Sequence, residues 1–139
     1  MSAAFVLDCS VAMTWLFQDE ATPDTAKILR RLDAEAALVP AWLFLELANV
    51  MVVAERKGRI TQRQTTEFVT ELSKLNLDVD SESPQRAFEH LLPLCRAHEL
   101  TSYDAMYLDL AVRRQLPLAT LDRSLRKAAQ KLGVKLLGQ

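Results

Sequence analysis

Four acidic residues of the chain stand where an apolar segment ends or is interrupted. Asp8 follows the apolar run AFVL, and Asp122 follows the run PLATL. Asp104 comes early in the helix-like segment SYDAMYLDLAV, and Glu46 stands inside VPAWLFLELANVMVVA with no Lys or Arg within a helical turn. Asp8 and Asp122 are also good helix N-caps, and Asp104 suits the first turn of a helix. Glu46 has no such structural explanation, because burying an unpaired carboxylate is costly or forces its protonation.

Together these acids predict a site for a divalent cation. Carboxylates that converge repel one another and raise one another's pKa unless a cation lies between them. Mg²⁺ and Mn²⁺ prefer oxygen ligands and keep water in their remaining positions. Such an ion can lower the pKa of a water molecule and stabilise charge on a phosphodiester, and two ions about 3.5–4 Å apart can hold both the attacking and the leaving oxygens. The acids therefore indicate hydrolytic nuclease chemistry.

Two hydroxyl residues stand close to these acids in the sequence. Thr120 lies two residues before Asp122, so on a strand both side chains point to the same face. Its hydroxyl could orient a water molecule or bond a carboxylate, although a β-branched residue in a strand needs no such role. Ser10 has a similar pair of interpretations, as a partner of a helix N-cap or as a hydroxyl beside the site.

The other acids and both histidines do not fit the same pattern. Asp109 lies about 140° around an ideal helix from Asp104, so we expect it to be exposed or at an interface. We expect Asp78 and Asp80 to lie in loops or at a sheet edge. We expect no catalytic role for His90 and His98.

The order of the predicted elements indicates how the acids are positioned. Short apolar runs predict strands at residues 4–8, 36–40, 77–79, 116–121 and 134–137. Helical patterns lie over 22–35, 41–58, 61–75, 83–100, 102–115 and 123–133, with Thr61 as an N-cap, Gly58 after a helix end and Pro93 as a kink or break. Segment 41–58 is apolar nearly all round and is expected to be a buried helix.

This alternation predicts an α/β fold with a mainly parallel central sheet of about 4–5 strands flanked by helices. In such sheets ligands gather at the carboxyl ends of the strands, where Asp8 and Asp122 fall.

The composition is that of a soluble globular protein, and we expect one domain over residues 1–139. Half of the residues are hydrophobic and 25% are charged. Cys9 and Cys95 form no CxxC pair, so we expect two buried free thiols. The N-terminus has no signal-peptide pattern, and the longest apolar run is shorter than the roughly 20 residues of a membrane span. These features predict a cytoplasmic protein without a membrane segment.

The charge is distributed unevenly although the formal net charge is only −1. The first fifty residues hold three basic and seven acidic residues, whereas residues 111–139 hold seven basic residues and one acidic residue. A basic segment of this kind attracts phosphate groups, and the alternative is an ordinary solvated helix face. The candidates for contacts with nucleic-acid phosphates are Arg113, Arg114, Arg123 and Arg126.

Four motifs together resemble the PIN-domain family, and most closely the VapC-type toxins of bacterial toxin–antitoxin pairs. They are VLDCSV, ELANVM, SYDAMYLDLAV and LATLDRSL, in the family's order and spacing. The resemblance runs from Phe5 to Leu137, so it covers nearly the whole chain.

The resemblance implies a PIN fold and a Mg²⁺- or Mn²⁺-dependent endoribonuclease. By motif, the family's acidic quartet corresponds to Asp8, Glu46, Asp104 and Asp122, and its accessory hydroxyls correspond to Ser10 and Thr120. We expect Asp8, Asp104 and Asp122 to hold the metal, and Glu46 to be a ligand or the partner of a metal-bound water. Many relatives carry a further acid where this chain has Ser124, which leaves open whether one ion or two are bound.

The resemblance also implies partners. Members of the family usually form homodimers and are inhibited by a VapB-like antitoxin whose C-terminal segment covers the active-site groove. Helices around TWLF and AWLFLELANVM are candidates for holding that segment, and the alternative for most of these residues is ordinary core packing.

Two other functions fit the same residues. A PIN scaffold could bind RNA or a protein partner without cleaving, although a binding module gains nothing from clustered acids that repel one another. A metal-dependent DNA nuclease would use the same carboxylates equally well.

Overall fold

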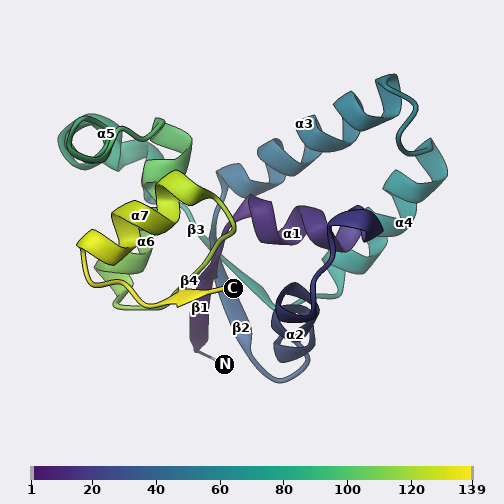
Figure 1. The fold of residues 1–139 in the computed structure, drawn as a ribbon, viewed down its shortest axis with the longest axis horizontal. Helices are drawn as coiled ribbons and strands as arrows, with labels where there is room; N and C mark the ends of the chain where they lie inside the picture. The colour runs from purple at the N-terminus through teal and green to yellow at the C-terminus, as the bar shows by residue number, and fades with distance from the viewer. Residues whose placement is uncertain (1, 139) are drawn as a thin grey trace.

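A five-stranded parallel sheet runs through the centre of the computed structural model, which describes residues 2–138 (Figure 1). The strands lie in the order β3-β2-β1-β4-β5, and every neighbouring pair is parallel. They are β1 (Ala3–Leu7), β2 (Ala36–Pro40), β3 (Leu77–Asp80), β4 (Leu118–Ala119) and β5 (Leu136–Leu137). The predicted α/β fold with a parallel central sheet is confirmed.

The inner strands β1 and β2 are nearly or fully buried, which explains why their sequences are continuously apolar rather than alternating. Val6, in β1, pairs with Leu38 on one side and with Leu118 on the other. The run predicted over 116–121 forms only the short strand β4. Pro117 comes just before it and has no N–H to donate to the ladder, although its carbonyl accepts the N–H of Val6 at 2.8 Å.

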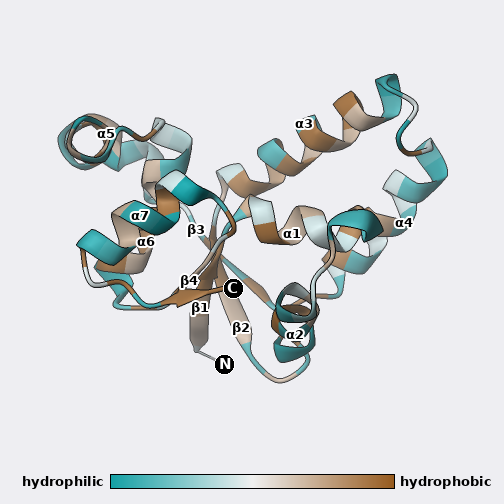
Figure 2. Ribbon diagram, in the orientation of Figure 1, coloured by the Kyte–Doolittle hydropathy of each residue, from teal (hydrophilic) through white to brown (hydrophobic). Residues whose placement is uncertain are grey.

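Helices cover both faces of the sheet. In the described residues they are α1 (Cys9–Leu16), α2 (Pro23–Arg31), α3 (Trp42–Arg56), α4 (Gln62–Ser73), α5 (Leu92–His98), α6 (Ser102–Arg114) and α7 (Arg123–Lys131). Figure 1 shows α1 to α4 on one side of the strands and α5 to α7 on the other. Figure 2 shows hydrophobic residues along the central strands and mixed residues on the helices, so the core lies between the sheet and the inner helix faces.

Local signals set the ends of several helices. Thr22 and Thr61 each form a capping box at the start of α2 and α4. Gly58 follows α3 with φ of +72°, a left-handed conformation that glycine adopts without a steric penalty. These residues confirm the predicted N-cap at Thr61 and the predicted helix end at Gly58.

The segment predicted as one helix over 83–100 is divided. It begins as a 3₁₀-helix over Ser83–Arg86, continues as a short π-helix over Ala87–Leu91 and only then becomes α5. Pro93 lies in the first turn of α5, where its missing N–H costs little. The change from π-helix to α-helix falls just before this proline, where a kink or division was expected. Cys95, on α5, is only partly buried, so the expectation of a buried thiol fails there.

Helix α3 is buried on one face only, which corrects the expectation of a fully buried helix. Its inward residues, among them Leu43 and Leu47, are buried in the hydrophobic core, and the helix packs against α1. Its outward face leaves large apolar side chains exposed, namely Trp42, Phe44, Leu45 and Val52. Hydrophobic colour recurs along α3 in Figure 2. Neither α3 nor any other helix within residues 2–138 is long and apolar enough to cross a membrane.

Asp109 is buried and fully paired, so the expectation that it is exposed or at an interface was wrong. Its two carboxylate oxygens accept hydrogen bonds from Arg86 at 2.6 and 2.9 Å, and Arg113 lies 3.3 Å from one of them. Arg113 also pairs with Asp80 at 3.1 Å and with Glu82 at 2.8 Å. Asp80 does lie at the end of edge strand β3, as expected, but it is buried. This cluster ties α6 to the segment that follows β3.

Replacing Asp109 should destabilise the fold substantially. Asp109→Ala leaves the guanidinium groups of Arg86 and Arg113 mostly buried without their shared partner, so we expect a loss of about 3 kcal/mol in the free energy of unfolding. Urea denaturation followed by circular dichroism measures the loss. Arg63→Ala is the matched control, since it removes an exposed ion pair with Glu67 and should cost below about 1 kcal/mol. Equal losses in the two variants would contradict the structural role of the cluster.

Candidate active site

The four acids singled out in the sequence line a single pocket of about 290 Å³. Asp8 follows β1 directly, and Asp122 is the N-cap of α7. Asp104 lies in the first turn of α6, and Glu46 lies in the second turn of α3. The other residues that line this acidic pocket are Cys9, Ser10, Met13, Asn49 and Val50.

The strand order explains why acids from distant parts of the chain meet. Strand β1 lies next to β4, although more than a hundred residues separate them in the sequence. The N–H of Asp8 donates to the carbonyl of Ala119 at 3.0 Å, so the ends of the two strands stay paired. Both strands deliver an acid to the same carboxyl edge, and α3 and α6 bring Glu46 and Asp104 to the same place.

Asp8 occupies an N-cap position, but its side chain does not cap the helix. Its Oδ2 instead accepts hydrogen bonds from the hydroxyls of Ser10 at 2.5 Å and Thr120 at 2.7 Å. The carboxyl is buried at 3% exposure. A buried carboxylate that is held by two hydroxyls and does not cap its helix is not explained by the local demands of α1.

The two hydroxyls are themselves fixed by backbone groups. Ser10 Oγ accepts the N–H of Leu121 at 2.9 Å, and Thr120 Oγ1 accepts the N–H of Asp122 at 3.1 Å. Because each hydroxyl oxygen accepts one of these N–H groups, its own hydrogen is directed to Asp8. The structure thus places Ser10 and Thr120 beside the first acid, where the sequence had suggested accessory hydroxyls.

Glu46 has a partner that sequence reasoning missed. The hydroxyl of Tyr107 donates to Glu46 Oε1 at 2.6 Å, and Tyr107 is completely buried. Tyr107 lies three residues after Asp104 on α6. Residues three apart share one face of a helix, so the position of Asp104 could have pointed to Tyr107. The bond connects the acid of α3 to the helix that carries Asp104.

Asp122 serves two purposes at once. Its Oδ1 accepts the N–H of Leu125 at 2.8 Å, which is the ordinary bond of an N-cap. The same side chain lines the acidic pocket, so the capping role and the functional role are compatible. Asp104 is half-buried in the first turn of α6 and also lines the pocket.

The electrostatics of the pocket favour a cation. Burial, followed by the charges of Asp8 and Asp104, raises the pKa of Glu46 to about 7. Burial and the charges of Asp122 and Asp8 raise the pKa of Asp104 to about 6, and burial raises the pKa of Asp8. No Lys or Arg is among the residues that line the pocket. The negative charge of the acids is therefore not balanced by protein groups at the pocket wall.

The donors available to an ion are oxygen atoms. Burial and the neighbouring acids raise the pKa of the Cys9 thiol, so Cys9 stays protonated in the metal-free protein. Within residues 2–138 no three His, Cys, Asp or Glu side chains are already arranged as a direct metal cage. Mg²⁺ usually keeps several waters and uses only one or two carboxylates, so an open pocket of acids fits such an ion.

Two of the four arginine candidates are engaged in internal contacts. Arg113 pairs with Asp80, Glu82 and Asp109, which corrects the expectation that its guanidinium serves nucleic-acid phosphates. Arg126 donates to the carbonyls of Thr120 at 2.6 Å and of Leu137 at 3.1 Å. The exposed candidates are Arg114 and Arg123.

The raised pKa values predict that the metal-free protein loses stability as the pH rises. Glu46 and Asp104 hold protons in the folded state at a pH where the unfolded chain has already released them. Their contribution to the free energy of unfolding is therefore fully present below about pH 4 and is lost as the pH rises to about 8. We expect a loss of about 1–2 kcal/mol, reduced by the solvent screening of these half-buried groups. Thermal melts in EDTA across this range measure it.

Glu46→Gln is the control for this pH dependence, because it keeps an oxygen for Tyr107 but cannot titrate. Its stability should vary less with pH than that of the wild-type protein. Wild-type stability that rises from about pH 5 to about pH 8 would contradict the assignment of these carboxyls.

Comparisons with known proteins agree with the observed fold. The chain is similar in structure to PAE2754 from Pyrobaculum aerophilum, with a TM-score of 0.69 and 20% sequence identity, over 96% of this chain and 83% of that chain. At this identity the similarity shows the fold alone. No curated protein matches the chain. The model of the PIN domain matches residues 5–131, and the chain therefore belongs to the PIN-domain family.

Proposed function

We propose that the chain is a metal-dependent endoribonuclease, the toxin component of a toxin–antitoxin pair. PIN domains are generally metal-dependent nucleases. The observation that carries the proposal is the convergence of four carboxylates from separate segments on one pocket without a balancing Lys or Arg. A folded protein gains no stability from this arrangement, because burial and mutual repulsion penalise the charged forms.

Three of the four acids are proposed to hold the metal ion, and the fourth, Glu46, has a different proposed role. Asp8, Asp104 and Asp122 are the residues that would hold a divalent ion, Mg²⁺ or Mn²⁺, and Ser10 and Thr120 fix the first of them. A bound ion would lower the pKa of a water molecule and stabilise negative charge on the phosphodiester. Ser10 and Thr120 hold Asp8 in one orientation, so little reorganisation is needed on binding.

We expect Glu46 to be the partner of the attacking water and to accept its proton. Burial raises the pKa of Glu46 to about 7 in the metal-free protein, and an ionised carboxylate can serve as a general base. Tyr107 occupies Oε1 with its hydrogen bond and leaves Oε2 to accept the proton. Burial and the neighbouring carboxylates raise the pKa of the Tyr107 phenol, so it remains a donor throughout.

RNA is the proposed substrate, and the resemblance to VapC-type toxins favours it over DNA. The exposed guanidinium groups of Arg114 and Arg123 are available for phosphate contacts. Arg123 follows Asp122 directly, so it stands at the edge of the acidic pocket.

Replacing Asp8 should abolish cleavage and preserve the fold. Asp8→Asn keeps the size and an oxygen acceptor for Ser10 and Thr120 but removes the charge, so we expect RNA cleavage in Mg²⁺ or Mn²⁺ to fall by about 100-fold or more. Gel analysis of a mixed RNA pool, with EDTA lanes, measures the activity. Asp24→Asn is the matched control on exposed α2 and should cleave like the wild type.

The outcomes separate the competing functions. A fully active Asp8→Asn protein would refute the site assignment. Cleavage of single-stranded DNA in preference to RNA of the same sequence would indicate a DNA nuclease. A wild-type protein that binds no Mn²⁺ in titration calorimetry and cuts neither polymer would instead be a non-cleaving scaffold.

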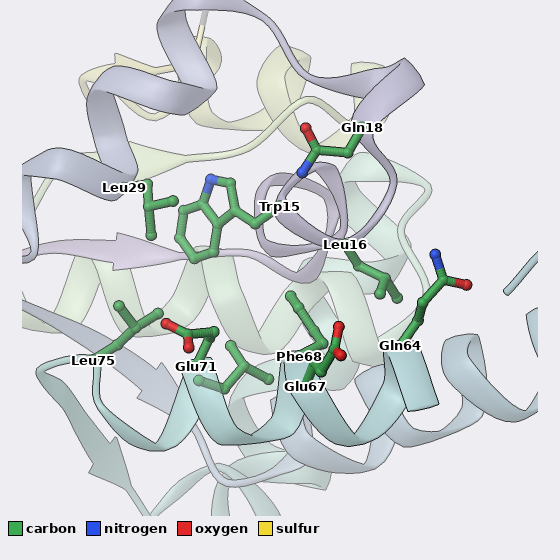
Figure 3. A pocket seen from close by; sticks show the side chains of 10 residues that line it. Trp15, Leu16, Gln18, Leu29, Gln64, Glu67, Phe68, Glu71 and Leu75 are labelled. Atoms are coloured by element: carbon green, nitrogen blue, oxygen red, sulfur yellow. The ribbon is translucent and has the colours of Figure 1, made fainter. Parts of the chain in front are cut away.

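The antitoxin partner is proposed to dock in an apolar groove between α1, α2 and α4. The groove has a volume of about 350 Å³ and includes Trp15, Leu29 and Phe68, whose side chains converge in Figure 3. Glu67 and Glu71 lie along its α4 edge. A segment with apolar residues for the floor and basic residues for this edge fits the groove. Trp15 and Leu16 belong to the TWLF segment that the resemblance singled out.

A charge placed in the groove should release the toxin from its inhibitor. We expect Leu72→Glu, on α4, to bind a VapB-like antitoxin at least about tenfold more weakly, because the new carboxylate must be desolvated against apolar side chains. Cleavage assays with and without the antitoxin measure the loss of inhibition. Val69→Glu, exposed on the same helix and outside the groove, is the control. Equal inhibition of both variants would place the partner elsewhere.

A further inference from the structure

A second pocket lies on the same two helices that carry Glu46 and Asp104. It has a volume of about 250 Å³ and is formed by the first turns of α3 and α6 and by the segment after β3. Its walls include Trp42, Tyr103, Ser83, Leu91 and Met106. The volume is below the roughly 300–1,000 Å³ of pockets for drug-sized ligands, so it suits one small ring system.

Two aromatic side chains stand at this pocket with much of their surface open to solvent. Trp42 is 40% exposed and Tyr103 is 54% exposed. Exposed aromatic rings are costly to leave in water, and they offer flat faces on which another ring can stack. Both rings come from helix starts, where the backbone holds their positions.

The pocket also contains an unpaired polar group. Ser83 is 4% exposed, and its hydroxyl has no hydrogen-bond partner within the described residues. A buried hydroxyl without a partner is unfavourable, and a serine hydroxyl reaches a new partner by rotation about a single torsion. The pocket therefore favours an occupant with flat apolar faces and a polar edge.

The second pocket and the acidic pocket share no lining residue, but both are lined by residues of α3 and α6 that lie close together along these helices. Tyr103 precedes Asp104 in the chain, and Trp42 lies one helical turn before Glu46 on α3. Four residues of an α-helix span about 6 Å along its axis. A ligand whose phosphate lies at the acids would thus have its neighbouring groups within reach of Trp42 and Tyr103.

We propose that this pocket binds a nucleobase of the single-stranded nucleic acid whose backbone crosses the acidic site. The base stacks on Trp42 and Tyr103, and its polar edge pairs with the Ser83 hydroxyl. Base stacking on aromatic residues is a general means of holding single strands, and it does not require sequence preference. The inference rests on the proposed nuclease function and assigns to it a substrate-positioning subsite.

The chemistry of the pocket disfavours a purely apolar occupant. An aliphatic or phenyl side chain from a protein would cover the rings but leave the Ser83 hydroxyl unpaired. Phe88, the most exposed aromatic residue of the chain at 88%, follows Ala87, which lines this pocket. Insertion of Phe88 from a second copy of the chain is therefore the alternative that the experiment must distinguish from a nucleobase.

The experiment uses Trp42 as its own reporter. The chain has two tryptophans, so Trp15→Phe leaves Trp42 as the single one, and Asp8→Asn prevents destruction of the RNA. This double variant is titrated in Mg²⁺ with a short single-stranded RNA pool and with an abasic ribose-phosphate chain of the same length. We expect the RNA to quench Trp42 fluorescence and the abasic chain to leave it unchanged.

Binding measurements on further variants complete the test. Anisotropy of labelled RNA should show that Trp42→Ala, in the Asp8→Asn background, binds about tenfold or more weakly, in line with the loss of one base–aromatic stack. Phe88→Ala in the same background is the matched control and should bind like its parent. Tyr103→Ala should weaken binding in the same direction as Trp42→Ala, which guards against a folding defect in either variant.

Each result has a distinct meaning. Equal quenching by RNA and the abasic chain, or equal affinity of the Trp42→Ala and Phe88→Ala variants, would overturn the subsite. Trp42 fluorescence could instead change with protein concentration in the absence of RNA and stop doing so in Phe88→Ala. That result would assign the pocket to a second copy of the chain and would also overturn the proposed nucleobase subsite. Wild-type cleavage is measured in parallel, so a protein that cuts RNA without base stacking disproves the subsite alone, whereas one that cuts nothing disproves the proposed function.

Discussion

The buried carboxyl of Asp8 is the constraint on which the rest of the site depends. A carboxylate placed at the end of a central strand loses most of its hydration, and burial raises its pKa. The fold compensates with the hydroxyls of Ser10 and Thr120, each of which is held by a backbone N–H. These hydrogen bonds stabilise the charged form only in part, so the site remains unfavourable until a cation neutralises it.

The sheet order places that carboxyl beside its partners. Because β4 pairs with β1 rather than with β3, the crossover from β3 to β4 returns Asp122 to the edge where Asp8 lies. Helix α6 starts at the same edge and carries both Asp104 and Tyr107. Tyr107 then links this helix to Glu46, so a shift of α3 relative to α6 would change the proton affinity of Glu46 as well as its position.

The sequence predicts those parts of the structure that are set by local patterns. Continuous apolar runs identify the strands, and Thr61 and Gly58 mark helix ends, because these features act through neighbouring residues. Contacts between distant residues escape the sequence. The pairing of Asp109 with Arg86 spans 23 residues, and no local pattern announces it. The exposed face of α3 also escapes, because an apolar run does not show how much neighbouring structure covers it.

The four acids are not equally informative as probes of the site. Asp122 both lines the pocket and caps α7, so its replacement would combine loss of an oxygen donor with fraying of the helix. Asp104 lies in the first turn of α6, where its charge also interacts favourably with the helix dipole. Asp8 makes no capping bond, and its two hydroxyl partners can donate to an amide oxygen as well as to a carboxylate oxygen. A change of charge at Asp8 therefore separates the chemistry of the site from the stability of the fold.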